Sequence, residues 1–121
     1  RYGLASRVRL AQVRSLEDRV LSRLRERLDL LVSNPPYVPT PRLARLDRAV
    51  RLEPRLALDG GPKGANIVVM LLTQGVNLLR PGGLLAVEID ATHEAVVRKL
   101  APDAEIERDL AGRIRYAFLK R

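Results

Sequence analysis

The sequence predicts an α/β domain, because short apolar strands alternate along it with segments of helical periodicity. Apolar runs over residues 28–33 and 84–89 are typical of strands in a parallel sheet, where both faces are buried. Between them, residues 65–79 carry apolar side chains at the spacing of a buried helix. The alternation of apolar and polar residues over 114–119 predicts a final strand. A length of 121 residues allows one domain at most.

The remaining elements follow from the same patterns. A half-buried strand is expected over residues 7–13, and a helix over residues 16–27, where leucines and valines recur at helical spacing. Residues 92–100 are expected to form another helix, and residues 104–109 another strand. The segment 80–83 (Arg-Pro-Gly-Gly) is expected to end the helix before it and to reverse the chain, because proline disfavours helix continuation and glycine suits a turn.

Residues 34–64 form a long, irregular loop in this prediction. Prolines at positions 35, 36, 39, 41 and 54 lack backbone N–H groups and interrupt regular structure. Only a short helix around residues 42–49 is expected inside the loop. Gly60 and Gly61 are expected to supply a positive φ or a close approach of two backbones, and a plain flexible turn is the alternative. Long loops inside compact domains are often functional.

Cysteine is absent from the chain, and the only histidine is His93. This composition excludes a disulfide scaffold and a cysteine nucleophile, and it argues against a zinc site, so no metal is expected. His93 falls in the helix expected over 92–100 and is interpreted as a surface residue. No apolar run approaches the roughly 18 residues of a membrane span, and no segment has the features of a signal peptide. A membrane partner is therefore not expected.

The chain carries a net charge of +8, and residues 1–55 hold most of the excess, with 13 basic and 6 acidic residues. Such an excess permits an acidic partner such as a nucleic acid. The alternative is that arginines, which are 19 of the 22 basic residues, cover solvated helix faces. Charge alone leaves the two interpretations open.

The tetrapeptide Asn34-Pro35-Pro36-Tyr37 follows directly on the strand expected over 28–33. Ligands of open α/β sheets bind at the carboxyl ends of strands, so the motif lies where a site is expected. The Asn34 side-chain oxygen and the Pro35 carbonyl could together hold both hydrogens of an –NH2 group. Tyr37 could pack on the flat face of that group, and the prolines restrict φ and so preorganise the site. This chemistry suits a planar nitrogen substrate, and a proline-rich turn without function is the alternative.

With its flanking segments, the motif resembles the HemK-type protein-(glutamine-N5) methyltransferases of peptide chain release factors. The resemblance is carried by residues 34–39 (Asn-Pro-Pro-Tyr-Val-Pro), 53–58 (Glu-Pro-Arg-Leu-Ala-Leu), 60–64 (Gly-Gly-Pro-Lys-Gly) and 80–83. It extends over residues 1–121. It implies a cytoplasmic enzyme that uses S-adenosylmethionine to methylate the glutamine in the Gly-Gly-Gln loop of a release factor.

The resemblance also implies roles for single residues. Asn34 and the Pro35 carbonyl would be the catalytic groups that hold the glutamine amide, and Asn34 would also bind the cofactor. Pro36 and Tyr37 would line the substrate site. Glu53 would fold back toward the substrate, and pairing with one of the many arginines is its alternative. No strong base is obvious at the motif, so catalysis would rest on positioning and on electrostatics around the methyl sulfonium.

The implied fold is the Rossmann-like, class I fold of S-adenosylmethionine-dependent methyltransferases, a seven-stranded mixed sheet. In that sheet strands 1 and 2 lie between strands 3 and 4, and strand 7 lies between strands 5 and 6. Residues 1–121 would supply strands 3 to 7. The glycine-rich cofactor loop after strand 1, strand 2 and an N-terminal helical domain have no counterpart in the sequence. We therefore expect the C-terminal part of a catalytic domain, inactive alone, with one edge of strand 4 unpaired.

The sequence departs from the family pattern at three further places. Val13-Arg14 stands where a Gly-Asp pair is usual near the adenine, Lys63 replaces an acidic residue, and Asp90 replaces a glycine. Two other functions remain as alternatives: a nucleic-acid amino-methyltransferase acting on adenine N6, and a binding module without catalytic activity. Because the motif points to a protein glutamine, we expect a protein partner rather than a nucleic acid.

Overall fold

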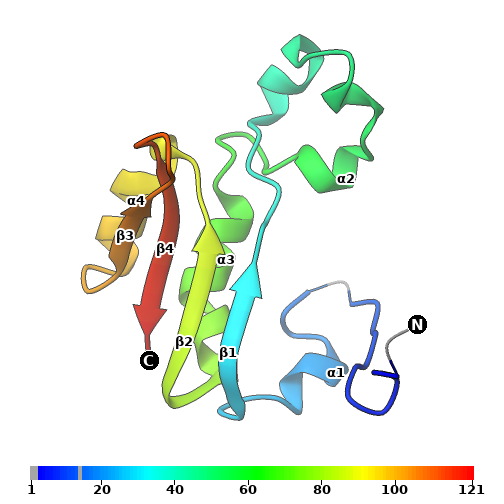
Figure 1. The fold of residues 1–121 in the computed structure, drawn as a ribbon, viewed down its shortest axis with the longest axis vertical. Helices are drawn as coiled ribbons and strands as arrows, with labels where there is room; N and C mark the ends of the chain where they lie inside the picture. Colours follow the sequence, from blue (N-terminus) through cyan, green and yellow to red (C-terminus); the bar gives the residue numbers. More distant parts are fainter. Residues whose placement is uncertain (1–2, 14) are drawn as a thin grey trace.

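A computed structural model describes residues 3–13 and 15–121, and its centre is a four-stranded mixed sheet (Figure 1). The strands are β1 (Leu28–Ser33), β2 (Leu79–Glu88), β3 (Glu105–Arg108) and β4 (Ile114–Lys120), in the order β1-β2-β4-β3. β1 and β2 are parallel, and the other neighbouring pairs are antiparallel. All four strands expected from residue 28 onward are confirmed. Their order agrees with the one that the resemblance implies for its strands 4 to 7.

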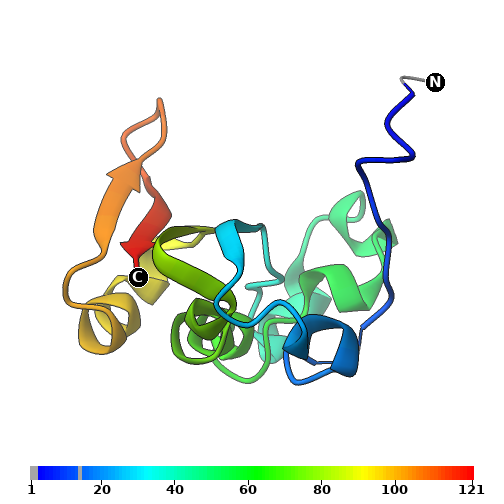
Figure 2. The same cartoon turned by 90° about the horizontal axis from the view of Figure 1, so that it is seen from below.

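The structure describes four helices, and two of them, α3 and α4, cover one face of the sheet. The helices are α1 (Arg19–Ser22), α2 (Arg55–Leu58), α3 (Asn66–Thr73) and α4 (Glu94–Leu100), with the 3₁₀ turns η1 (Thr40–Arg45), η2 (Val50–Leu52), η3 (Gly75–Leu78) and η4 (Ala91–His93). α3 and α4 lie on the same side of the sheet (Figure 2). The helix expected over 65–79 is present as α3 followed by η3, and the one expected over 92–100 as η4 followed by α4. Within the described residues, no helix has the length and apolar character needed to cross a membrane.

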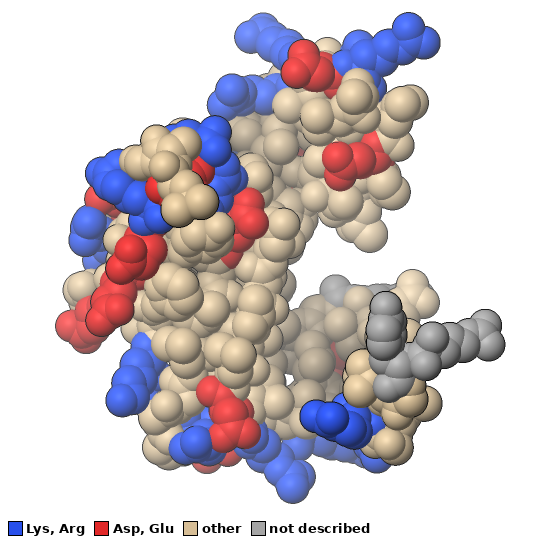
Figure 3. Space-filling model, viewed as in Figure 1, with Lys and Arg blue, Asp and Glu red and all other residues tan. Residues whose placement is uncertain are grey.

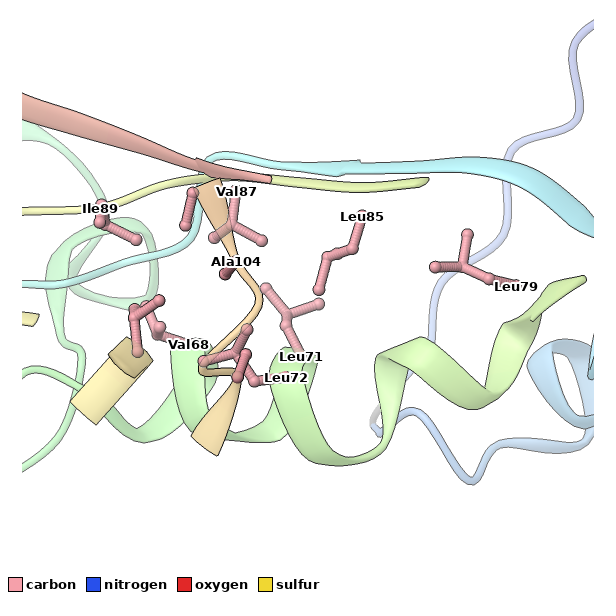
Figure 4. Packing of buried hydrophobic residues seen from close by; sticks show 11 residues of the cluster. Val68, Leu71, Leu72, Leu79, Leu85, Val87, Ile89 and Ala104 are labelled. Atoms are coloured by element: carbon pink, nitrogen blue, oxygen red, sulfur yellow. The ribbon is translucent and has the colours of Figure 1, made fainter. Parts of the chain in front are cut away.

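The hydrophobic core lies between the sheet and helices α3 and α4 (Figure 4). α3 contributes Val68, Leu71 and Leu72, whose spacing places them on one helical face. Leu85 and Val87, alternate residues of β2, point toward them from the sheet. The other buried members are Leu79, Ile89, Val97, Ala101, Ala104 and Ala117. Each fully buried leucine or valine contributes about 1.5–3 kcal/mol, so this packing holds β2, whose carboxyl end borders the site.

α3 and α4 leave the opposite face of the sheet open, and in the described structure β1 pairs on one side only. Leu30 and Val32 of β1 are 52% and 66% exposed on the open face, and Leu84, the register partner of Leu30, is 36% exposed. Leu31 points the other way and packs against the core. The unpaired edge that we expected at this strand is thus present in the described residues. Such an edge is a template for pairing with another segment.

Two predictions for the N-terminal region are wrong. Residues 7–13 form no strand and lie exposed, and the helix expected over 16–27 is reduced to the four residues of α1. Asp18 caps α1 by accepting a hydrogen bond from the Val20 N–H at 3.0 Å, yet no residue of α1 is buried. A strand needs a hydrogen-bonded neighbour, and a short helix is marginal in water without a buried face. Arg14, half of the pair that departs from the family pattern, lies outside the described residues.

The segment 80–83 ends the preceding helix as predicted, since η3 stops directly before β2, and it makes the expected tight turn: a Cβ on Gly83 would lie 3.0 Å from the Arg80 carbonyl oxygen and 3.1 Å from the Leu79 Cβ. The turn lies inside β2 as a bulge, because β2 advances five positions from Leu79 to Leu84 while β1 advances two, from Leu28 to Leu30. Gly82 has a φ of 77°, and a Cβ on Gly83 would lie 2.8 Å from a carbonyl oxygen of β1. Glycine is therefore needed here both for the tight turn and for the close approach to β1.

Residues 38–60, here called the excursion, leave the sheet beyond the carboxyl end of β1 and return to α3 (Figure 1). The excursion contains only η1, η2 and α2, so the predicted irregular loop is confirmed. The short helix expected around 42–49 is a 3₁₀ turn, η1, displaced toward the N-terminus. The first and last residues of the excursion, here called its stem, are hydrogen-bonded to each other. The Val38 N–H donates to the Leu58 carbonyl and the Gly60 N–H donates to the Val38 carbonyl, both at 2.9 Å.

Candidate functional site

The tetrapeptide predicted as the site lies at the carboxyl end of β1, next to the carboxyl end of the parallel strand β2. Asn34 is exposed, Pro35 is buried, and Pro36 and Tyr37 are half-buried. Within the described part of the chain, the Asn34 side chain forms no hydrogen bond and no donor outside the strand ladders is bonded to the Pro35 carbonyl. The motif therefore has two unused acceptors at the carboxyl end of β1.

A glycine-rich segment, residues 60–64, packs directly on the backbone of the motif. A Cβ on Gly60 would lie 2.8 Å from the Pro36 carbonyl oxygen, and a Cβ on Gly64 would overlap the Tyr37 carbonyl oxygen. Gly61 and Gly64 have φ values of 90° and 75°, a region that side chains other than glycine rarely adopt. The positive φ or close approach expected of Gly60 and Gly61 is confirmed, as a close approach at Gly60 and a positive φ at Gly61. This segment is a fitted support for the motif and not a flexible turn.

A single carboxylate, that of Asp59, fastens the stem of the excursion to this glycine segment. Its Oδ1 accepts from the Thr40 hydroxyl at 2.6 Å and from the Gly61 N–H at 3.0 Å, and its Oδ2 accepts from Arg55 at 3.0 Å. The Thr40 hydroxyl and the Gly61 amide hold the pKa of Asp59 below its usual range, against the opposing effect of burial. Asp59 is thus ionised at neutral pH and joins the two arms of the excursion.

Tyr37 is positioned by an ion pair that spans β2 and β4. Arg115 of β4 donates to Glu88 of β2 at 3.1 Å, and both side chains are about three-quarters buried. The Tyr37 hydroxyl lies 3.5 Å from Glu88 Oε1 and 3.4 Å from Arg115 Nη1. The guanidinium also lies 3.7 Å from Asp109. These contacts are at the long end of hydrogen bonding, so they orient the ring more than they anchor the hydroxyl.

His93 lies beneath Tyr37, and the prediction that it is a surface residue is wrong. Its side chain is 1% exposed, its Nδ1 accepts from the Asp90 N–H at 3.0 Å, and its ring meets that of Tyr37 edge-on with centroids 6.3 Å apart. Burial lowers the pKa of His93 more than the Asp90 charge and the Gly64 carbonyl raise it. A neutral ring with an accepting Nδ1 carries its proton on Nε2. Nε2 is buried, and the described residues offer it no partner of hydrogen-bond geometry.

A signal for the buried histidine was present in the sequence. His93, Val97 and Ala101 follow one another at four-residue spacing, and all three are buried in the structure. That spacing places them on one face of a helix, the face that packs on the sheet. The Asp90 side chain caps the same turn by accepting from the Thr92 N–H at 2.9 Å, which explains an acidic residue at this position.

The structure does not bring Glu53 to Tyr37. Glu53 is exposed at the end of η2 and lines a pocket of 370 Å³ inside the excursion, together with Arg51 and Arg55. It forms no ion pair within the described residues, so neither the expected contact with the motif nor the alternative pairing with an arginine is seen.

The pocket that does adjoin the motif has a volume of 150 Å³. Its walls are Tyr37, Val38, Pro39, Arg42, Leu46, Asp90 and Thr92. Its polar walls Arg42, Asp90 and Thr92 were not predicted as site residues. Arg42 sits in η1, whose regular spacing of arginines was the available signal.

The described residues do not enclose a nucleoside cofactor. Asn34 is exposed and follows directly on β1, whose outer edge is free, and no glycine-rich loop of the dinucleotide-binding type ends a described strand. The surface is hollowed on this side, between the excursion above and the N-terminal residues below (Figure 3). The described residues hold no group of three or more His, Cys, Asp or Glu side chains that could bind a metal ion. The arrangement can hold an amide or amino group, but by itself it builds no cofactor pocket.

Comparison with known proteins relates the chain to one family. No family model matches it. It is 46% identical over 122 residues to the release factor glutamine methyltransferase of Moorella thermoacetica, a match that covers 95% of the chain and 41% of the relative. The proteins of the same name from Caulobacter vibrioides and Deinococcus radiodurans are 49% and 37% identical, over 60% and 90% of the chain and 25% and 41% of the relative. The chain thus spans about two fifths of the length of such relatives. By sequence, the chain is thus similar to a part of the release factor glutamine methyltransferases.

Proposed function

We propose that the chain provides the substrate-amide site of an enzyme that methylates N5 of the glutamine in the Gly-Gly-Gln loop of a peptide chain release factor. The observation that carries the proposal is the position of Asn34 and Pro35, two unused acceptors at the carboxyl end of β1. The relatives that support it are named for this substrate class. The proposed site of action is the cytoplasm, where translation termination takes place.

In the proposed reaction, the chain's own residues hold and orient the amide. The Asn34 side-chain oxygen and the Pro35 carbonyl accept one hydrogen each from the glutamine –NH2 group, which fixes its plane. Tyr37, held by Glu88 and Arg115, forms the wall against which the amide packs. An amide nitrogen is a poor nucleophile because its lone pair is delocalised, so the rate gain comes from positioning and from the two aligned carbonyl dipoles.

S-adenosylmethionine is the proposed methyl donor, and it would supply an electron-poor methyl group. Because the described residues do not surround such a molecule, no step is assigned to contacts with it. We propose instead that residues 1–121 form one part of a catalytic domain, and that the glycine-rich cofactor loop and the substrate-docking helical domain lie outside these residues. Asn34 would face both the cofactor and the substrate amide, and Glu53 would reach the substrate from the excursion.

The test uses a chimera in which residues 1–121 replace the matching segment of the Moorella thermoacetica relative. Transfer of a labelled methyl group is measured to a release factor, to the same factor with its Gly-Gly-Gln glutamine replaced by alanine, and to adenine-containing DNA and ribosomal RNA. The expected result is label on the intact release factor alone. Label on nucleic acid alone would overturn the proposal in favour of an adenine methyltransferase, and a chimera that binds the factor without methylating it would indicate a binding module.

A pair of asparagine variants links this activity to the motif. Asn34→Ala is expected to lower kcat by about 100-fold, as removal of one preorganised polar group does in other enzymes. Asn77→Ala is the matched control, because Asn77 lies before β2 at the opposite end of the parallel strands. Equal losses in the two variants would disconnect the motif from the reaction.

A further inference from the structure

The excursion carries a row of four arginines: Arg42, Arg45, Arg48 and Arg51. They recur every third residue, and residues three apart lie on the same side of a 3₁₀ turn, so Arg42 and Arg45 share a face of η1. All four are exposed, and none pairs with a carboxylate within the described structure. Basic side chains project from the excursion into solvent at the top of Figure 3.

Apolar residues alternate with the arginines and hold the row in place. Leu43, Leu46 and Val50 are half-buried, whereas the arginines between them are exposed. This alternation leaves all four charged side chains exposed. Because water stabilises the charged heads of arginine side chains, a solvated row is the simplest state of the free protein.

The row begins at the motif and leads away from it. Arg42 lines the 150 Å³ pocket beside Tyr37, and Arg51 lines the 370 Å³ pocket farther out in the excursion. Two acidic residues lie near the row, Asp47 within it and Glu53 just after Arg51, and both are exposed and form no ion pairs within the described residues. A bound chain that reaches the motif can therefore run along the arginines.

Two leucines next to the row indicate what kind of partner it fits. Leu52 and Leu56 are 83% and 88% exposed, and Leu56 lines a third pocket, of 470 Å³, at the base of the excursion. Arginine beside exposed apolar side chains is typical of protein–protein interfaces. Surfaces that bind single-stranded nucleic acid present aromatic side chains for stacking, and residues 38–60 contain none.

We propose that the excursion docks an acidic, partly apolar surface of the protein substrate, with the arginine row pairing carboxylates and Leu52 and Leu56 becoming covered. This inference rests on the proposed function, in which the substrate is a release factor. Arginine suits the task because its planar guanidinium can form two parallel hydrogen bonds with one carboxylate. Exposed pairs of this kind weaken as salt rises, so docking is salt-dependent.

The test compares two triple charge reversals in the chimera. Arg45→Glu, Arg48→Glu and Arg51→Glu alter the row but leave Arg42, which lines the motif pocket, unchanged. The matched control reverses Arg19, Arg23 and Arg25, which are also exposed but lie around α1, beyond the opposite end of β1. Both variants change the net charge equally.

The row variant is expected to raise KM for the release factor by about tenfold, since each exposed pair contributes only modestly, with kcat unchanged. Its KM should also lose the rise with salt that the parent shows. The control is expected to keep the parental KM, and Leu56→Ser to raise KM without changing the salt dependence. Equal KM values in the row variant and the parent, or equal losses in row variant and control, would overturn the docking surface.

Direct binding separates this inference from the proposed function. Affinities for the release factor and for a 20-nucleotide single-stranded RNA are measured by fluorescence anisotropy. If the parental chimera binds the factor but transfers no methyl group, the proposed function fails, while a weaker affinity of the row variant still supports docking. Loss of RNA binding with unchanged affinity for the factor would assign the row to nucleic acid and overturn the proposal.

Discussion

Replacing Gly64 by alanine tests whether the glycine segment supports the motif. Gly64 has a φ of 75°, and a Cβ at this position would overlap the Tyr37 carbonyl oxygen. The atom it meets belongs to the backbone, so no side chain can rotate away to make room. Gly112, in the turn between β3 and β4, is the matched control: its φ is 78°, and a Cβ there would meet nothing within 4 Å.

The two substitutions share one cost and differ in another. A left-handed conformation costs a residue with a side chain about 1–2 kcal/mol, and both variants carry this cost. Only Gly64→Ala must also displace backbone, for which overpacking in a close-packed interior costs about 1–3 kcal/mol more. We therefore expect Gly64→Ala to lower the free energy of unfolding by about 1–3 kcal/mol more than Gly112→Ala does.

Urea denaturation followed by far-UV circular dichroism measures the difference directly. The same variants in the chimera should differ in methyl transfer, with the larger loss for Gly64→Ala, because the displaced backbone carries Tyr37. If Gly64→Ala and Gly112→Ala have equal unfolding midpoints, the segment does not press on the motif. The interpretation of residues 60–64 as a support would then be refuted.

Three further predictions address the ion pair, the buried histidine and the cofactor. Arg115→Met leaves the three-quarters buried Glu88 carboxylate without its main cation, so the free energy of unfolding in urea should fall by about 1–3 kcal/mol. The control Arg98→Met, at an exposed pair, should lower it by about 0.5 kcal/mol or less. Equal losses would contradict the role of the Glu88–Arg115 pair. Because the pKa of His93 is lowered in the folded state, the unfolded chain binds more protons as pH falls below its ordinary value of 6.5, so stability should be full above that pH and decrease below it. His93→Gln should reduce the difference in urea midpoint between pH 7.5 and pH 5.5, and an unchanged difference would assign the pH dependence to other groups. Finally, titration calorimetry of the 121-residue protein alone should detect no binding of S-adenosylmethionine in the micromolar range, and such binding would show that these residues build a cofactor pocket after all.

The sequence alone predicted the elements that are recognised by their own pattern of apolar residues and prolines. The apolar runs of β1 and β2 and the alternation in β4 mark strands, because a strand that faces a core must be apolar on that face. The motif at residues 34–37 was found the same way, since prolines after an apolar strand define a rigid end whatever lies around it.

The failures share one cause, which is dependence on a neighbour. Residues 7–13 alternate as a strand should, but the described residues provide no strand beside them, so they form no strand and remain exposed. The segment 80–83 makes the turn that its composition predicts, but its place inside β2 as a bulge depends on pairing with β1. The prediction that His93 lies at the surface fails because its burial depends on the tertiary packing of its helix.

What only the tertiary structure decided is how the motif is held. Tyr37, Glu88 and Arg115 come from three segments, and Arg115 lies 78 residues from Tyr37 along the chain. The order β1-β2-β4 brings them together, because β2 and β4 pair so that Glu88 and Arg115 lie side by side at the end of the sheet where β1 ends. A sequence specifies which side chains can hold an amide, but the number of residues between them does not give the distance between them in the folded protein. That distance is set by strand order and by the core packed beneath the sheet.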